Sequence, residues 1–222
     1  MQEYEDFIKK LLEEYMLSEE DMTPSQKKIA EAALRLFAEK GFEASTTSEI
    51  AKAAGVAEGT IYKYFKTKKD LLFALVIPTI IRMAGPVLLR DVEAIAKLKD
   101  LSTEELLGRL MLNRLQLVQQ NWAAFKVALQ EMQYHPELKD ALVSHVAAKG
   151  RLIVNSLLAE KVESGELRNL NLDSMTRVLV SLLAGYIFAK QMFSEEAQDW
   201  NDTEEIKLMV DIYLNGVKKR DQ

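Results

Sequence analysis

The stretch "GVAEGTIYKYFKTKKD", residues 55–70, sets the direction of any structural interpretation of this 222-residue chain. The chain carries a formal net charge of −5, yet the segment from Thr60 to Lys69 contains four lysines and no acidic residue. The same segment contains two tyrosines and a phenylalanine. A short basic and aromatic segment in an acidic protein predicts a local contact with a polyanion.

The charge distribution confines this contact to one part of the chain. Residues 1–22 hold two lysines against eight acidic residues, whereas residues 23–69 hold nine basic residues against five acidic ones. With no cysteine, the sequence offers no disulfide framework and no thiolate metal site, which is typical of a reducing cytosol. Because no basic segment followed by an apolar run opens the chain, we expect a cytoplasmic protein.

Composition and periodicity predict an all-α protein. Glycine and proline are scarce, and apolar residues recur at the three- and four-residue spacing of amphipathic helices. Beyond the basic segment, helices are expected over residues 3–17, 87–99, 102–134 with a break near Asn121, 136–164, 172–193 and 203–219. The apolar stretch from Leu71 to Leu89 is interrupted by Pro78 and Arg82, so we expect buried helices there and no membrane span.

Capping patterns mark where the short helices of residues 23–70 begin. In each pattern a threonine, serine or aspartate precedes Glu, Gln or Asp by three residues, so that each side chain bonds the other residue's backbone N–H. The pairs are Thr23 with Gln26, Thr46 with Glu49, Thr67 with Asp70 and, further along, Ser102 with Glu105 and Asp202 with Glu205. Glycines at 41 and 55 are expected to end the first two helices, with Phe42 folding back over the last turn.

A short helix over residues 58–65 follows the glycine turn at 55–57. Two short helices joined by a tight turn, behind a longer first helix, form the helix-turn-helix arrangement. On the last helix, Ile61 and Phe65 would face the core. The opposite face would present Gly59, Thr60, Lys63 and Tyr64, whose hydroxyl, ammonium and phenol groups are suited to base edges in the major groove.

Phosphate ligands are expected beside this helix. Thr46 and Thr47 lie at a helix start, where free N–H groups favour an anion. Lys68 lies in the first turn of the next helix, where its charge opposes the helix dipole, and a phosphate would explain that placement. Other interpretations remain open: the threonines serve only as caps, Tyr62 is a half-buried packing residue, and the lysines form a solvated face.

Residues 25–72 resemble the DNA-binding domain of the TetR family of bacterial transcriptional regulators. The resemblance rests on "AALRLFAEKGFEASTTSEIAKAAGVAEGTIYKYFKTKKDLL", with its G-F-x-x-x-T-T, I-A-x-x-A-G-V, G-T-I-Y-x-Y-F and K-x-x-L motifs. It implies a homodimer that binds double-stranded operator DNA, with a helical C-terminal domain that takes a small effector and releases the DNA. By matching position, the DNA contacts would be Thr46, Thr47, Glu58, Gly59, Thr60, Tyr62, Lys63, Tyr64 and Lys68.

The resemblance also implies a domain division. A three-helix DNA-binding domain over residues 23–70 would be joined to a larger helical bundle over residues 71–222, for effector binding and dimerisation. Residues 1–22 depart from the pattern of many family members. This acidic amphipathic segment should not lie along a phosphate backbone, so we expect it to dock on protein.

Two residue sets are expected in the C-terminal part. The last two helices would pair across a two-fold axis, through Leu179, Leu183, Gly185, Tyr186, Val210, Tyr213 and Val217. Methionine and aromatic side chains make adaptable apolar walls, so a lipophilic effector would contact Met83, Met111, Trp122, Phe125, Met132, Tyr134 and Tyr186. For both sets the alternative is that the side chains are simply core.

Nothing in the sequence predicts catalysis, a metal or a cofactor. His135 and His145 belong to no metal-binding spacing, and there is no nucleophile elbow, phosphate loop or dinucleotide motif. Two alternatives to an effector-controlled regulator remain. One is an architectural or cell-division DNA-binding protein without a small ligand, and the other is a protein-binding helical module.

Overall fold

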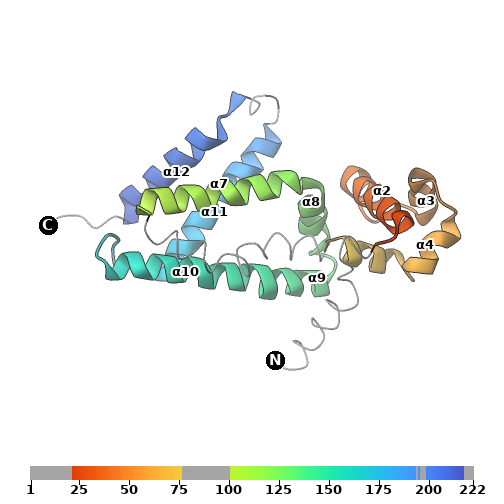
Figure 1. Cartoon of the computed structure of the whole chain (residues 1–222), viewed down its shortest axis with the longest axis horizontal. Coiled ribbons are helices and arrows are strands. Elements are labelled where there is room, and N and C mark those ends of the chain that lie inside the picture. Colours follow the sequence, from red (N-terminus) through yellow and green to blue (C-terminus); the bar gives the residue numbers. More distant parts are fainter. Residues whose placement is uncertain (1–21, 77–100, 194, 196–198, 218–222) are drawn as a thin grey trace, which may run out of the picture. The chain divides into compact units, whose positions relative to one another are not determined.

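A computed structural model of the chain describes residues 22–76, 101–193, 195 and 199–217 (Figure 1). Every regular element in this part of the chain is a helix, which confirms the predicted all-α class. Its contacts divide it into two compact units. Among the described residues, the first unit comprises residues 22–76 and 121–147, and the second unit comprises residues 101–120 and 148–217.

The first unit begins with the predicted helix-turn-helix. Its helices are α2 (Pro24–Lys40), α3 (Thr47–Ala54), α4 (Glu58–Tyr64) and a helix over residues 68–76. The same unit also contains α8 (Trp122–Glu131), α9 (Pro136–Ala141) and a π-helical turn, η1 (Leu142–Ala147). The predicted helices over residues 3–17 and 87–99 lie outside the described residues.

The predicted capping boxes begin three of these helices. The Thr23 and Thr46 hydroxyls accept from the backbone N–H three residues later, and the Gln and Glu side chains bond back to the threonine N–H. Thr67 and Asp70 form the same reciprocal pair, with N···O distances of 2.9 and 3.0 Å. Gly55 ends α3 at φ 68°, a left-handed conformation that favours glycine.

The core of the first unit confirms the predicted buried face. Ile29, Phe37, Ile50 and Ile61 are all at most 1% exposed, and burial of each such side chain contributes about 1.5–3 kcal/mol. Phe42 folds back as expected, because its ring packs edge-on against Phe37 with centroids 5.2 Å apart. Apolar residues from α8 and α9 complete the same core, namely Val127, Ala128 and Leu138.

Polar contacts also tie α8 and α9 to the helix-turn-helix. The Lys126 ammonium donates to the Ala38 carbonyl at the end of α2, over 2.7 Å. Lys69 pairs with Glu137 at 2.8 Å. The His135 ring packs edge-on against Phe42, with centroids 5.5 Å apart. The helices α2 to α4 therefore form one compact body with residues 121–147.

The described part of the second unit is a bundle of four helices, α7 (Thr103–Gln120), α10 (Ala148–Glu163), α11 (Leu172–Met192) and α12 (Asp202–Val217). The predicted break at Asn121 is confirmed, since α7 ends at Gln120 and α8 begins at Trp122. The core of this unit is lined by residues of all four helices. It includes Leu107, Met111, Leu115, Leu158, Met175, Leu179, Tyr186, Ile206, Val210 and Tyr213.

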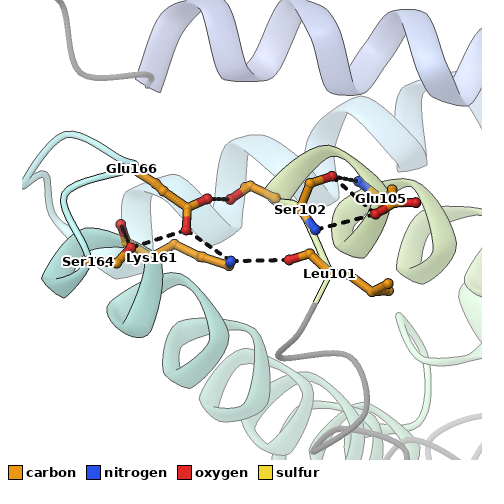
Figure 2. A network of polar contacts seen from close by, with 7 residues as sticks. Leu101, Ser102, Glu105, Lys161, Ser164 and Glu166 are labelled. Carbon is orange, nitrogen blue, oxygen red and sulfur yellow. Dashed lines mark hydrogen bonds and ion pairs between the residues drawn. The ribbon is translucent and has the colours of Figure 1, made fainter.

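A polar network joins the start of α7 to the end of α10 (Figure 2). Glu166 accepts from the Thr103 hydroxyl at 2.5 Å and from the Lys161 ammonium at 3.0 Å. These two donors hold the pKa of the Glu166 carboxyl below its usual value. Lys161 also donates to the Leu101 carbonyl, beside the predicted Ser102 cap. The network fixes the beginning of α7 within the second unit.

The prediction that Asp202 caps α12 is wrong. The Asn201 side chain does this instead, because its Oδ1 accepts from the backbone N–H groups of Thr203 and Glu204. Asp202 is the first residue of the helix, and its carboxylate accepts from the Tyr186 hydroxyl at 2.6 Å, from Gln119 Nε2 at 3.0 Å and from the Lys190 ammonium. This carboxylate therefore links α7, α11 and α12.

Candidate nucleic-acid interface

The exposed face of α4 presents the polar groups that the sequence predicts for it. Ile61 is buried, while Gly59 and Lys63 are exposed and Thr60 and Tyr64 are partly exposed. Among the described residues, and apart from its chain neighbours and the backbone of α4, nothing lies within 4 Å of the position that a Cβ of Gly59 would occupy. The Lys63 ammonium lies 5.7 Å from the centre of the Tyr64 ring. This face is open to a surface that approaches it closely.

Thr46 is a helix cap whose hydroxyl is fully engaged. Its Oγ1 donates to Glu49 Oε2 at 2.8 Å and accepts from the Glu49 backbone N–H. The Glu49 carboxylate also pairs with the Lys40 ammonium at 2.5 Å. Lys40 and Thr46 together lower the pKa of Glu49 to about 2. Glu49 therefore keeps its negative charge next to the start of α3.

Thr47, Glu58 and Tyr62 form a hydrogen-bonded cluster between α3 and α4. The Thr47 hydroxyl donates to Glu58 Oε1 at 2.6 Å, and the Tyr62 hydroxyl lies 3.1 Å from Thr47 Oγ1. Tyr62 is 51% exposed, so a packing role and a phosphate contact both stay predictions for it. The cluster is missed by sequence reasoning, because nothing in the spacing of eleven residues signals that Thr47 meets Glu58.

Lys68 has protein partners that the sequence did not indicate. Its ammonium donates to the carbonyls of Phe42 at 2.9 Å and Ser45 at 3.1 Å, and lies 3.4 Å from the carbonyl of Glu43. It also lies 4.3 Å from the centre of the Phe42 ring. These partners explain why a cation is placed against the local helix dipole. A phosphate contact of Lys68 stays a prediction.

The residues expected to line an effector site are divided between the two units. Met111 and Tyr186 belong to the core of the second unit. In the first unit, Trp122 and Phe125 pack with ring centroids 5.9 Å apart, Met132 packs against the core, and Tyr134 is 77% exposed. Met83 lies outside the described residues. An effector site stays a prediction.

A groove of about 480 Å³ lies elsewhere in the second unit, between α7 and α12. Its lining combines apolar side chains with charged residues of both signs. It is lined by Glu104, Glu105, Gly108, Arg109, Leu112, Thr203, Ile206, Lys207, Val210, Asp211, Leu214 and Asn215. None of the predicted effector residues lines this groove.

The residues expected at a dimer interface are mostly inside the second unit. Leu179, Tyr186, Val210 and Tyr213 are each at most 8% exposed within the single chain. Leu183 is partly buried, Gly185 is exposed, and the side chain of Val217 is not among those described. Apart from its chain neighbours and the backbone of α11 itself, no atom of the described residues lies within 4 Å of where a Cβ of Gly185 would be.

Other apolar side chains of α11 and α12 are exposed. On α11 they include Val178, Phe188 and Met192, with exposed fractions from 52% to 66%; on α12 they are Leu208 and Ile212, at 53% and 57%. By length and composition α11 is apolar enough to span a membrane, and only 22% of its most apolar window is buried. A single helix of this kind is weak evidence for a membrane protein.

Two protein-family models match the chain. One describes bacterial regulatory proteins of the tetR family and matches residues 29–75; the other describes the C-terminal domain of AefR-like transcriptional repressors and matches residues 106–215. The chain belongs to the TetR family. This membership identifies α2 to α4 as a TetR-type helix-turn-helix.

Curated relatives resemble this TetR-family chain in the DNA-binding part. The fatty acid metabolism regulator protein of Bacillus subtilis is 52% identical over 52 residues, and the regulator AcrR of Shigella flexneri is 43% identical over 54 residues. These matches cover about a quarter of this chain and about a quarter of each relative's own length.

Solved structures extend the resemblance over most of the chain. A tetR-family regulatory protein from Rhodococcus RHA1 has a TM-score of 0.71 at 20% identity, covering 90% of this chain and 100% of that one. The regulator FadR of Bacillus subtilis, solved in complex with stearoyl-CoA, has a TM-score of 0.64 at 25% identity. That match covers 86% of this chain and 98% of FadR.

Proposed function

We propose that this TetR-type regulator is a repressor that binds a palindromic operator as a homodimer and is released by a small lipophilic effector. The observation that carries the proposal is the open polar face of α4, in the segment that matches the tetR model. The protein would act in the cytoplasm, and we infer no catalytic activity, metal or cofactor.

The proposed DNA contacts follow the division of labour common in protein–DNA complexes. Thr60, Lys63 and Tyr64 would meet base edges, because they lie on the face of α4 opposite the buried Ile61. Thr47 and Tyr62 would meet phosphates, since their hydroxyls lie at the start of α3. Gly59 would allow close approach, and Thr46 would position α3 through its cap.

The proposed dimer uses the exposed face of α11 and α12. Exposed apolar side chains and the open surface at Gly185 support this assignment, because large apolar patches on soluble proteins mark interaction sites. Phe188 and Ile212 would be central residues, alongside Leu183 and Val217 from the predicted set. Two recognition helices in such a dimer would read half-sites about 34 Å apart in successive major grooves.

A long-chain acyl-CoA is the effector we would test first. The support is the likeness to Bacillus subtilis FadR, which was solved with stearoyl-CoA, and to the fatty acid metabolism regulator protein. Of the predicted contacts, Met111 and Tyr186 lie in the core of the second unit, and the bundle must open there to admit an acyl chain. Trp122, Phe125 and Met132 belong to the first unit, and their part in effector binding stays a prediction.

Selection of random duplex DNA by the purified protein tests the DNA-binding proposal. We expect a palindromic motif, with weaker base preferences for Tyr64→Ala. Tyr134→Ala is the matched control, because Tyr134 is 77% exposed and lies between α8 and α9, outside the segment that matches the tetR model. No enrichment at low salt would refute operator binding.

Titration of the protein–operator complex then tests the effector. Stearoyl-CoA should displace the operator, whereas coenzyme A alone should not, since the acyl chain supplies the apolar contact. If neither stearoyl-CoA nor shorter acyl-CoA molecules change operator affinity, the acyl-CoA assignment is wrong. Operator binding without any effector would favour the architectural role.

A further inference from the structure

The hydroxyl protons of Thr47 and Tyr62 are both donated within the cluster that these residues form with Glu58. A threonine hydroxyl has one proton, and that of Thr47 is donated to Glu58 Oε1 at 2.6 Å. The contact between Thr47 and Tyr62, at 3.1 Å, must therefore take its proton from the tyrosine. The cluster is a chain of donors that runs from Tyr62 through Thr47 and ends on the Glu58 carboxylate.

This arrangement hides two groups that a DNA backbone would use. A phosphate oxygen only accepts hydrogen bonds, and in the cluster both hydroxyls offer it only lone pairs. Either hydroxyl contacts a phosphate only after its proton leaves its partner in the cluster. The Glu58 carboxylate thus occupies the place that a phosphate would take at Thr47.

The charge of Glu58 adds a second obstacle. Glu58 is exposed at the beginning of α4, and within the described part of the chain it forms no ion pair. Two lysines next to the start of α3 have other partners, since Lys40 pairs with Glu49 and Lys68 binds backbone carbonyls. A phosphate at Thr47 would therefore approach an unneutralised carboxylate.

A displaced carboxylate needs a new hydrogen-bond donor. Glu58 is the first residue of α4, and in helix-turn-helix complexes the N-terminal residues of the second helix contact base edges. In the major groove the available donors are the exocyclic amino groups, and Glu typically accepts from N4 of cytosine. DNA with that amino group in reach gives Glu58 a partner, whereas other DNA leaves it unpaired beside a phosphate.

We propose that Glu58 is a specificity-determining residue that excludes non-operator DNA. In the free protein it masks Thr47 and Tyr62, and in the operator complex it moves onto a base amino group. This inference rests on the proposed operator binding. Discrimination would then depend on two interactions of Glu58. One is its repulsion from a phosphate in non-operator DNA, and the other is its hydrogen bond with a base amino group in the operator.

The test compares Glu58→Gln with Glu31→Gln in the full-length protein. Both variants lose one negative charge, but Glu31 is exposed on α2 and lies outside the cluster. Affinity is measured for the selected operator duplex and for a scrambled duplex of the same composition. Thermal unfolding of each variant shows that the fold is kept.

We expect Glu58→Gln to bind the scrambled duplex about fivefold more tightly than the wild type, the effect of removing one charge about 4 Å from a phosphate in water. Its affinity for the operator should fall or stay the same, because the base contact loses its charge. The ratio of the two affinities should drop by about fivefold or more, and selection with Glu58→Ala should lose one C·G preference in each half-site.

Two results would overturn the inference while leaving operator binding intact. One is an effect of Glu58→Gln equal to that of Glu31→Gln, which would indicate only a change in net charge. The other is an equal gain for operator and scrambled duplexes, which would indicate no role in discrimination. A wild-type protein that selects no DNA would instead refute the proposed function itself, and this inference with it.

Discussion

Replacing Lys68 by methionine should destabilise the first unit, whether or not its ammonium also contacts a phosphate. Methionine keeps the length of the side chain but removes the ammonium, which binds carbonyls of the loop between α2 and α3. Hydrogen bonds to a charged group contribute about 1.5–3 kcal/mol, and the cation over the Phe42 ring adds about 0.5–1 kcal/mol.

Two effects reduce this loss. Lys68 is only partly buried, so water replaces some of the lost hydrogen bonds, and removal of a cation from a helix start returns a few tenths of a kcal/mol. We therefore expect the free energy of unfolding to fall by about 2 kcal/mol, or about 4–8 °C in the unfolding temperature. The exposed Lys66→Met is the charge-matched control and should change it by less than about 0.5 kcal/mol.

Operator affinity as a function of salt separates the two possible roles of Lys68. If its ammonium holds the loop, the slope of log K against log salt stays at the wild-type value in Lys68→Met. If it binds a phosphate, the slope falls by about one unit. A reduced slope with unchanged thermal stability would refute our assignment of Lys68 to the loop.

Three further predictions follow from the structure. Phe188→Glu should convert the dimer to a monomer in sedimentation velocity without loss of helicity, because this exposed side chain would be buried only by a partner; a dimer that persists would contradict the proposed interface. Tyr186→Phe should lower the free energy of unfolding in urea by about 1.5 kcal/mol through loss of the bond to Asp202, and an unchanged midpoint would show that the bond is not stabilising. The pKa of Glu49 is lowered to about 2 from 4.5, so its contribution to stability is complete above about pH 4.5 and is lost as the pH falls towards 2. Acid unfolding of Glu49→Gln should lack this contribution, and a profile identical to that of the wild type would count against it.

The local structure was predictable wherever neighbouring residues decide it. The caps at Thr23 and Thr46 follow from residues three positions apart, and the end of α3 follows from a single glycine. The failure at Asp202 has a definite cause. Asn201 and Asp202 are both good capping residues, and the choice was made by Tyr186 and other partners that are distant in sequence.

The site was predictable in its outward face but not in its internal contacts. The burial of Ile61 fixes which side of α4 is exposed, and helical periodicity alone indicates that side. The bond from Thr47 to Glu58 and the loop contacts of Lys68 depend on how two helices and a loop meet in space. For the same reason, Leu179 and Tyr213 have apolar surroundings that periodicity cannot assign to core or to interface.

Because residues 121–147 pack against the helix-turn-helix, they affect how the DNA-binding segment can be exchanged between regulators of this kind. A chimera joined at residue 70 would take the new DNA-binding segment away from Lys126, His135 and Glu137, whose partners are on the other side of the junction. An engineered regulator should instead carry residues 121–147 along with its donor DNA-binding segment, or keep the residues equivalent to Ala38 and Lys69 compatible with the recipient. New operator specificity would then be transplanted together with the packing on which it rests.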